Sequence, residues 1–550
     1  MWQSSSNALT REMFIPGKSS VQVPVLIVGA GPTGLCTSLL LSRYGIPSLL
    51  VERHASTSIY PRATGVSTRS MELFRQWGLD QRVKAAGFEL EDASAPVSLT
   101  LAQPELTRLP LGFPSAQEVA AVSPVTPCAC PQDALEPLLL ERARSYAEAQ
   151  VVFGTELTTI EQDGAGIRAT IIDRSTENAT LVEAHYVVAA DGAHSRVREH
   201  LGIAMQGPDQ LGNYLSVLFR ADLNRLIKSH VHGLYFIQHP EASGIFVPTS
   251  TDGRWVFAME WHPERGERLE DYDSERCIRL VRTATGVPDL DVELLGVQAF
   301  PFAAQVAQCY RKGNVFLAGD AAHRMTPSGG TGMNTGIHDA HNLAWKLAAV
   351  LKGWADTTLL ETYESERRPV GLHNTRRSNT RRVMGEHEED EESWSDLEID
   401  LGYCYESKVI IPDPAAEEVG TAPARSRLTC RPGRRAPHVW LTRGGKRIST
   451  LDLYDQTLTL VTGSAGTSWC EAADRVARAH GVPLVAHLIG PEGELGDGDS
   501  HWDETYKVEA DGALLIRPDG FVAWRKPGMV RDPQTELHHV VDQIVGHSPS

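Results

Sequence analysis

A short glycine-rich segment near the N-terminus constrains the fold of this 550-residue chain more than any other feature. Residues 24–30 form a β-branched apolar run, residues 31–44 have the apolar periodicity of a helix, and residues 47–52 form a second apolar run. The first run passes into the helix through the segment Val28-Gly29-Ala30-Gly31-Pro32-Thr33-Gly34. Short apolar runs on either side of a helix are typical of buried parallel strands, so the sequence predicts a βαβ unit.

The spacing of the three glycines indicates what this unit binds. In such a motif Gly29 allows the tight turn, Gly31 lets the backbone approach a pyrophosphate, and Gly34 lets the helix pack closely on the strand. The phosphates then lie at the helix N-terminus, where free N–H groups favour negative charge. Glu52 ends the second strand, where an acid binds ribose hydroxyls. The motif predicts a dinucleotide site, although alone it does not distinguish FAD from NAD, and a glycine-rich turn without ligand is the structural alternative.

Two later segments favour FAD. Ala190-Asp191-Gly192-Ala193-His194-Ser195-Arg196 follows the apolar run 186–190, and Ala318-Gly319-Asp320-Ala321-Ala322-His323 follows the run 315–318. Each segment places a carboxylate at the end of a predicted strand, where doubly wound sheets bind ligands and where it can accept hydrogen bonds from ribityl hydroxyls. Residues 327–334 are glycine-rich and precede a helix whose N–H groups would face the pyrimidine edge of a flavin.

Together these segments resemble the class A flavoprotein aromatic hydroxylases, the para-hydroxybenzoate hydroxylase family, and above all its branch of phenol, chlorophenol and polyketide hydroxylases. The resemblance spans residues 23 to 382 and includes Pro61-Arg62, Gln132 and residues 366–369. It implies an α/β fold with a glutathione reductase-type, Rossmann-like FAD-binding domain, an inserted β-sheet substrate domain and a C-terminal thioredoxin-like domain.

The resemblance also implies roles for individual residues. Glu52-Arg53 and the glycine segment would bind the ADP half of FAD, Arg62 and Gln132 the flavin or its phosphates, and Asp320 the ribityl chain. The segment at Asp191 would serve both FAD and NADPH, and the Pro327 carbonyl would lie near flavin C4a. A surface salt bridge is the structural alternative for Arg62, and His323 is expected to be a structural hydrogen-bonding residue rather than a base. The expected cofactor-binding residues are Gly29, Gly31, Pro32, Thr33, Gly34, Glu52, Arg53, Arg62, Gln132, Asp191, Gly319, Asp320, Pro327, Gly330, Gly332, Met333 and Asn334.

The implied activity is that of a FAD- and NAD(P)H-dependent monooxygenase acting on a phenolic or polyketide-type aromatic substrate. NADPH would bind transiently and reduce FAD, O2 would add at flavin C4a, and the hydroperoxide would deliver one oxygen atom. Such chemistry needs a dry pocket and a substrate phenol that is deprotonated or held by a hydrogen bond. Baeyer–Villiger insertion or epoxidation is the alternative outcome. A non-oxygenating flavin reductase or dehydrogenase and a flavin-bound scaffold without turnover are the alternatives from other classes.

The pattern of strands and linkers predicts the domain boundaries. Residues 214–219, 233–238, 244–247 and 254–261 indicate an inserted sheet, on which Tyr235 is a candidate catalytic residue for contact with a substrate hydroxyl. An ordinary strand tyrosine is its structural alternative, and Pro327 is the second catalytic candidate. Residues 386–437 are first acidic and then rich in proline and arginine, so we expect an exposed connection. The expected units are 21–206 and 301–385 for FAD binding, 207–300 for substrate binding, 386–437 as the connection and 438–550 as the thioredoxin-like domain, in which Cys470 stands without a Cys-x-x-Cys partner.

Composition excludes several other classes. A formal net charge of -18 argues against nucleic-acid binding. Eight scattered cysteines without Cys-x-x-Cys indicate a reducing compartment, and no His-Glu-x-x-His or clustered Cys/His set predicts a metal site. Residues 1–20 lack an apolar signal core, and glycines interrupt the apolar segment 25–41, so we expect neither a leader nor a membrane anchor. The expected protein is cytoplasmic, and a homodimer supported by the C-terminal domain is a further expectation.

Overall fold

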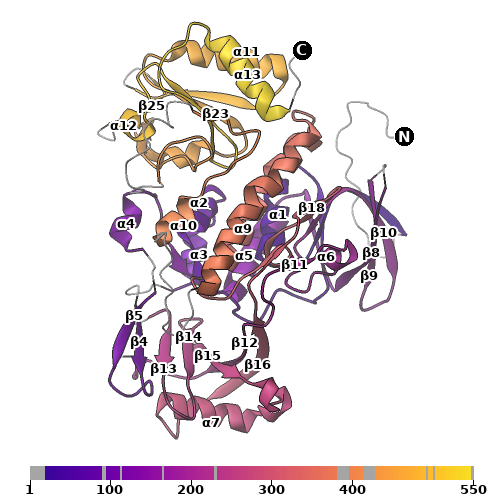
Figure 1. Cartoon of the computed structure of the whole chain (residues 1–550), viewed down its shortest axis with the longest axis vertical. Helices are drawn as coiled ribbons and strands as arrows, with labels where there is room; N and C mark the ends of the chain where they lie inside the picture. The colour runs from indigo at the N-terminus through magenta and orange to yellow at the C-terminus, as the bar shows by residue number, and fades with distance from the viewer. Residues whose placement is uncertain are drawn as a thin grey trace.

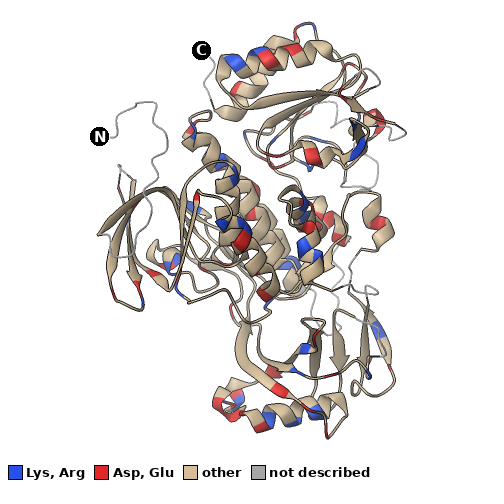
Figure 2. Ribbon diagram, turned by 180° about the vertical axis from the view of Figure 1, so that it is seen from behind, with Lys and Arg blue, Asp and Glu red and all other residues tan. Residues whose placement is uncertain are grey.

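The computed structural model of the chain describes residues 19–88, 94–111, 114–163, 166–227, 232–380, 395–413, 428–490, 493–498 and 502–546. Figure 1 shows three parts, with the N-terminal strands and the long helices in the middle, the inserted sheet below and the C-terminal unit above. Among the described residues, no helix is long and apolar enough to cross a membrane. Figure 2 shows acidic and basic residues interspersed on the helices of all three parts.

The middle part is built on a mainly parallel sheet. Its parallel strands are ordered β19-β10-β1-β2-β7, and β8, β9 and β18 add antiparallel pairs. The strands are β1 (Ser20–Val28), β2 (Ser48–Glu52), β7 (Ala149–Phe153), β8 (Thr155–Asp163), β9 (Gly166–Asp173), β10 (Ala179–Ala189), β18 (Arg311–Lys312) and β19 (Val315–Leu317). The apolar runs at 24–30, 47–52 and 315–318 are thus confirmed as buried strands.

Helices cover this sheet, including the one predicted over residues 31–44. They are α1 (Pro32–Arg43), α5 (Gln132–Arg144), α8 (Gly332–Leu351) and α9 (Thr362–Thr380). Helix α8 begins at Gly332, inside the glycine-rich segment that was predicted to precede it, and its first turn contains Gly332, Met333 and Asn334 rather than large apolar side chains. In register, Val28 of β1 pairs with Ala189 of β10, which pairs with Leu317 of β19. The three predicted motifs therefore emerge at the same edge of the sheet.

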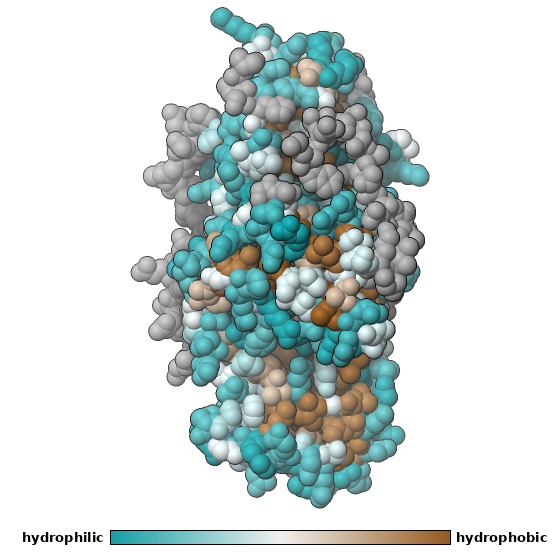
Figure 3. All heavy atoms as spheres, turned by 90° about the vertical axis from the view of Figure 1, so that its right-hand side faces the viewer, coloured by the Kyte–Doolittle hydropathy of each residue, from teal (hydrophilic) through white to brown (hydrophobic). Residues whose placement is uncertain are grey.

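The inserted sheet is larger than its sequence pattern indicated. The four predicted strands are confirmed, but the seven-stranded order β16-β12-β15-β14-β13-β4-β5 also includes two strands from before residue 207. The strands are β4 (Ser94–Ser98), β5 (Thr107–Pro110), β12 (Gly212–Arg220), β13 (Tyr235–Ile237), β14 (Gly244–Pro248), β15 (Arg254–Trp261) and β16 (Glu293–Phe302). Helix α7 (Ser274–Thr285) packs Cys277, Val281 and Ala284 into a core with Leu215 and Phe257 of the sheet. Figure 3 shows apolar surface gathered on this lower part of the molecule.

The C-terminal unit has a mixed sheet with two helices beside each other (Figure 1). Its strands are ordered β24-β23-β26-β27, with β23 and β24 parallel and the other pairs antiparallel. The elements are β23 (Leu458–Thr462), α11 (Thr467–His480), β24 (Leu484–Leu488), β26 (Ala513–Ile516), β27 (Val522–Lys526) and α13 (Pro533–Val545). Strands β26 and β27 form a hairpin whose turn lies at residues 518–520. A βαβ unit followed by a ββα unit favours the thioredoxin-like assignment, which stays a prediction. Burial raises the pKa of the Cys470 thiol, so this position lacks the stabilised thiolate of a redox centre.

The connection at 386–437 is not simply exposed, and that expectation was wrong for its described residues. Helix α10 (Asp396–Leu401) and the segment after it bury Tyr403 and Tyr405 against Val370 of α9 and Phe521 of the C-terminal unit. Charge composition misled here because scattered aromatic residues determine the packing. Residues 381–394 and 414–427 lie outside the described residues.

Candidate active site

The first and second motifs pack so closely that only glycine fits between them. Gly29 has φ +103°, and a Cβ atom at this position would lie 2.3 Å from the carbonyl oxygen of Ala190. A Cβ atom on Gly34 would lie 1.9 Å from the carbonyl oxygen of Gly29. The roles assigned to the first and third glycines in the motif therefore have a direct steric basis in this chain.

The third motif packs against the first through Thr33. A Cβ atom on Gly319 would lie 2.5 Å from Thr33 Oγ1, and one on Gly336 of α8 would lie 2.3 Å from the same atom. The start of α1, the end of β19 and the first turns of α8 therefore form one tightly packed junction.

In contrast, the middle glycine of the motif faces open space. No atom lies within 4 Å of a Cβ atom built on Gly31. Helix α1 starts directly after it without a side-chain cap, so the first N–H groups of the helix are available to an anion. Glu52 lies beside this turn, because its Oε2 accepts a hydrogen bond of 2.8 Å from the Ala30 N–H. Arg53 is exposed next to it.

The two motif carboxylates lie at the ends of β10 and β19, and each has at least one side open to further contacts. Asp191 Oδ2 accepts a hydrogen bond from the Val197 N–H at 3.2 Å, whereas Oδ1 is buried and has no hydrogen-bond partner among the described residues. Burial raises the pKa of Asp191. Asp320 is accessible from one side, but the protein around it raises its pKa by desolvation, an effect that the charges of His323 and Arg62 oppose. Donor hydroxyls of a ribityl chain would satisfy both groups.

Asn334 and Gln132 use their side chains within the protein. Asn334 Oδ1 accepts from the Ser67 N–H at 3.0 Å, and its Nδ2 donates to the carbonyl oxygens of Gly65 (3.0 Å) and Gly330 (2.9 Å). Gln132 Nε2 donates to Glu136 Oε1 at 2.7 Å. For Asn334 a cofactor contact would therefore come from the backbone. Helix α8 starts without a side-chain cap, which leaves the N–H groups of its first turn, including those of Gly332 and Met333, available to a ligand.

The loop before α8 is a tight glycine turn. Gly329 and Gly330 have φ +82° and +61°, and the Pro327 carbonyl accepts a hydrogen bond of 3.0 Å from the Gly330 N–H. Pro327 itself is exposed. Behind the loop lies a small cavity, and its lining includes Asn334, Asp400 and Tyr403.

A buried charge cluster that the sequence analysis did not identify supports this junction. Asp339 of α8 contacts His323 Nε2 and Arg367 Nε, each at 2.7 Å, and accepts the Gly319 N–H at 3.0 Å. Burial raises the pKa of Asp339, but the charges of Arg367 and His323 outweigh burial and lower it. His323 is fully buried in this cluster, which confirms the expectation that it is a structural hydrogen-bonding residue. The sequence around Asp339 did not indicate this pairing, because its partners His323 and Arg367 lie on other segments of the chain.

Tyr235 is not placed for catalysis, and its assignment was wrong. It is 4% exposed, packs at the core beside α7 with Trp255, and its hydroxyl oxygen accepts the His232 N–H at 3.0 Å. Strand alternation assigns the same face to Leu215, Phe246 and Phe257, which lie in this core.

The opposite face of the seven-stranded sheet points toward the FAD-binding part. Arg254 of β15 forms an ion pair of 2.6 Å with Asp133 of α5, and Gly296 of β16 lies so close to Tyr60 that a Cβ atom would be 2.6 Å from its hydroxyl oxygen. On this face Tyr214 stacks on Phe302 with ring centroids 3.9 Å apart, and Phe300 lies next to them. The face thus offers an apolar, aromatic wall close to the cofactor-binding loops.

Comparisons with known proteins agree with this site. Residues 22–378 match the family model described as FAD binding domain, and residues 429–548 match the model described as aromatic-ring hydroxylase, C-terminal. The chain belongs to the FAD-dependent aromatic-ring hydroxylases. FAD is its cofactor, and it is a monooxygenase of this family. The open glycine turn, the two carboxylates and the uncapped helix starts fit that group.

Similar proteins align over nearly the whole chain. A putative polyketide hydroxylase of Streptomyces halstedii is 40% identical, and a tetracenomycin A2 monooxygenase-dioxygenase of Streptomyces glaucescens is 39% identical; each alignment covers 96% of this chain and 98% of the relative. A solved ternary complex of aklavinone-11 hydroxylase with FAD and aklavinone is 34% identical and has a TM-score of 0.85, covering 96% of this chain and 99% of that one.

Proposed function

We propose that this enzyme uses NAD(P)H and O2 to insert one oxygen atom into a polyketide-type aromatic substrate. The observation that carries the proposal is the aromatic open face of the inserted sheet, joined to the FAD-binding part at Arg254–Asp133 and at Tyr60–Gly296. A tetracenomycin A2 monooxygenase-dioxygenase and an aklavinone 12-hydroxylase are among the relatives, and their alignments cover 96% and 95% of this chain.

The proposed cofactor contacts come from the residues already described. The N-terminus of α1 at Gly31 binds the pyrophosphate, Glu52 binds ribose hydroxyls, and Asp320 with the nearby charge of Arg62 holds the ribityl chain. The uncapped start of α8 stabilises negative charge at the pyrimidine edge. FAD, when bound, supplies the two-electron carrier and the oxygen-activating group. The remaining contacts expected from the sequence stay part of the proposal.

The open face has two roles in this proposal. The rings of Tyr214, Phe300 and Phe302 provide flat apolar area for a polycyclic substrate and exclude water from the reacting carbon. Burial raises the pKa of Tyr214, and the charge of Glu260 and a hydrogen bond to it add to the effect, so the phenol stays protonated and oriented toward Glu260. We propose that this pair sets the orientation of a polar substituent on the substrate.

The test measures flavin reduction by NADPH, and separately by NADH, in the absence of oxygen. The purified enzyme is mixed with single compounds from a panel of simple phenols and polycyclic polyketide aromatics. We expect one polycyclic class to accelerate reduction strongly and to gain one oxygen atom when air is admitted. Fast reduction without any compound and without coupled oxygen consumption would instead identify a reductase or dehydrogenase. The carbon skeleton of the product separates hydroxylation from Baeyer–Villiger insertion, since both add one oxygen atom.

Two further proposals concern the setting of the enzyme. All eight cysteines are free, as in proteins of a reducing compartment, which supports a cytoplasmic location. We also propose a homodimer of the 60.2 kDa chain. Sedimentation equilibrium of the FAD-loaded enzyme distinguishes this from a monomer by a twofold difference in mass.

A further inference from the structure

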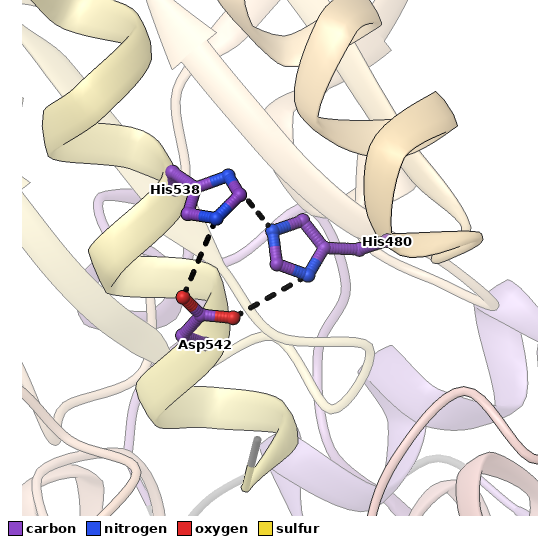
Figure 4. Close-up of side chains that lie close together, drawn as sticks. All are labelled: His480, His538 and Asp542. Atoms are coloured by element: carbon purple, nitrogen blue, oxygen red, sulfur yellow. Dashed lines mark hydrogen bonds and ion pairs between the residues drawn. The ribbon is translucent and has the colours of Figure 1, made fainter. Parts of the chain in front are cut away.

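Three metal-binding side chains meet between two helices of the C-terminal unit (Figure 4). His480 ends α11, while His538 and Asp542 lie one turn apart on α13. His480 Nε2 lies 3.0 Å from His538 Nδ1, His480 Nδ1 lies 3.4 Å from Asp542 Oδ1, and His538 Nε2 lies 3.6 Å from Asp542 Oδ2. One ligand atom from each residue lies within 4.8 Å of the other two. These residues belong neither to the FAD site nor to the open face of the inserted sheet.

The cluster is held by the fold and yet reachable from solvent. The side chains of His480 and Asp542 are 7% and 15% exposed, whereas that of His538 is 46% exposed. The neighbours of His538 and Asp542 on α13, Leu537 and Val541, are fully buried in the core and fix the orientation of the helix. Two ligands are therefore preorganised, and an ion can enter beside the third.

Proton counting shows why a cation suits this arrangement. Two neutral imidazoles carry two ring N–H protons in total, and a carboxylate carries none. The three pairwise contacts among His480, His538 and Asp542 would need three protons to become three hydrogen bonds. One contact therefore lacks a proton in the neutral cluster, and either an added proton or a metal ion bound by the free lone pairs would remove this mismatch.

The spacing of the three side chains can also be compared with that of a small metal site. Zn²⁺ bonds of about 2.0–2.2 Å to nitrogen and oxygen place the ligand atoms of a tetrahedral site about 3.4 Å apart. One ligand atom from each of the three residues lies within 4.8 Å of the other two, so the side chains must rotate and draw closer together to enclose a common ion. Imidazole and carboxylate ligands suit Zn²⁺ and related divalent transition-metal ions.

We propose that His480, His538 and Asp542 bind one divalent transition-metal ion, tested as Zn²⁺, with a fourth position open to solvent. The ion would link the end of α11 to α13 and stabilise the C-terminal unit, because binding to the folded state alone raises stability. His480 lies 58 positions before His538, so the complete ligand set exists only in the folded chain.

The test titrates the full-length, FAD-loaded enzyme with ZnCl2 by calorimetry after treatment with a chelator and desalting. The variants are His538→Ala and Asp542→Asn, and the matched control is His539→Ala, which removes the neighbouring exposed histidine on the same helix outside the cluster. Flavin content and unfolding without zinc establish that each variant is folded. The half-exposed position of His538 makes His538→Ala the variant that best preserves the fold.

We expect one zinc ion per chain in the wild type and in His539→Ala. Loss of an outer-shell partner alone weakens metal binding about 10–100-fold, so loss of a ligand in His538→Ala or Asp542→Asn should weaken it by at least about 100-fold. Zinc should raise Tm in the wild type and the control but not in the two cluster variants. No zinc binding in the wild type, or equal binding in all variants, would overturn the proposal. A Tm that responds to pH but not to zinc would mean that the cluster takes up only a proton.

Discussion

At the scale of single residues, Gly29 and Gly45 separate the effect of backbone strain from that of close packing. Both have positive φ, +103° and +69°, but a Cβ atom on Gly45 meets nothing within 4 Å, while one on Gly29 meets the Ala190 carbonyl oxygen at 2.3 Å. We expect Gly45→Ala to cost about 1–2 kcal/mol and to retain FAD. Gly29→Ala should also displace the second motif and lose most of the bound flavin. Flavin content after gel filtration, with thermal unfolding of both proteins, tests this, and stoichiometric FAD in Gly29→Ala would contradict it.

Asp400 should give the stability of the enzyme a specific pH dependence. Burial raises its pKa to about 6, despite a hydrogen bond of 2.8 Å from the Arg69 N–H. The folded state therefore binds a proton between about pH 4 and pH 6 that the unfolded chain releases, so the free energy of unfolding contributed by this group falls as pH rises through that window. Asp400→Asn should remove this slope and raise the free energy of unfolding by about 1–2 kcal/mol at pH 7. This is less than the full pKa shift corresponds to, because Asp400 lines a cavity and solvent there screens its charge. Denaturant unfolding of both proteins from pH 4.5 to 7.5 tests it, and identical slopes would refute it.

Residue roles could be predicted from the sequence where the chain itself encodes the geometry. The positions of Gly29, Gly34 and Asp320 follow from a strand that ends in a tight turn, and the structure places all three at one sheet edge. The face occupied by Tyr235 could not be predicted. Alternation says that neighbouring side chains point to opposite faces, but only α7 determines which face is the core.

At the scale of elements, the contact between β15 and α5 should determine how closely the open face of the inserted sheet packs against the FAD-binding part. Arg254 pairs with Asp133, whose side chain is 5% exposed and whose Oδ1 has no hydrogen-bond partner among the described residues. Arg254→Met leaves this carboxylate unpaired, so we expect a loss of about 1–3 kcal/mol and a larger share of NADPH consumed to form H2O2.

The control for this contact lies on the paired strand. Arg220 of β12 is the cross-strand partner of Arg254, and its ion pairs with Asp252 and Glu293 are exposed. Arg220→Met should cost less than about 1 kcal/mol and leave the coupling of NADPH to product unchanged. The H2O2 yield per NADPH and Tm are measured in both variants. Equal uncoupling in the two would mean that the Arg254–Asp133 pair does not position the sheet.

Elements with regular patterns were predicted, and those with strand breakers were not. The alternation in β12 and β15 is clear in the sequence. Strands β4 and β16 contain Pro96, Gly296 and Pro301, residues that argue against a strand. The structure accommodates Pro301 because β16 lies at the sheet edge, where its missing N–H has no required partner. That edge position follows from the assembled sheet and not from the local sequence.

At the scale of the whole molecule, the turn of the C-terminal hairpin is inserted into the FAD-binding part. Arg517 donates two hydrogen bonds, of 2.6 and 2.9 Å, to Glu366 of α9 and also pairs with Asp519. Lys346 of α8 contacts the same Glu366 at 2.7 Å, and all these side chains are buried. Burial raises the pKa of Glu366, but the charges of Arg517 and Lys346 outweigh it and lower the pKa. The hairpin was predictable from its turn residues; the buried network was not, because it joins residues 151 positions apart.

Loss of this network should destabilise both parts of the enzyme together. Arg517→Met leaves Glu366 and Asp519 buried without their main partner, so we expect a loss of about 3–5 kcal/mol and weaker FAD retention through α8. The control is Lys408→Met, which breaks the exposed 2.7 Å pair with Glu361 and should cost less than about 1 kcal/mol. In the double variant Arg517→Met/Glu366→Leu the loss of unfolding free energy should be smaller than the sum of the two single losses. Both charges of the Arg517–Glu366 pair are then removed, so neither is left buried without the other. Denaturant unfolding, followed separately by flavin release and by far-UV circular dichroism, measures these energies. Additive losses, or a C-terminal unit that unfolds without flavin release, would show that the network does not couple the two parts.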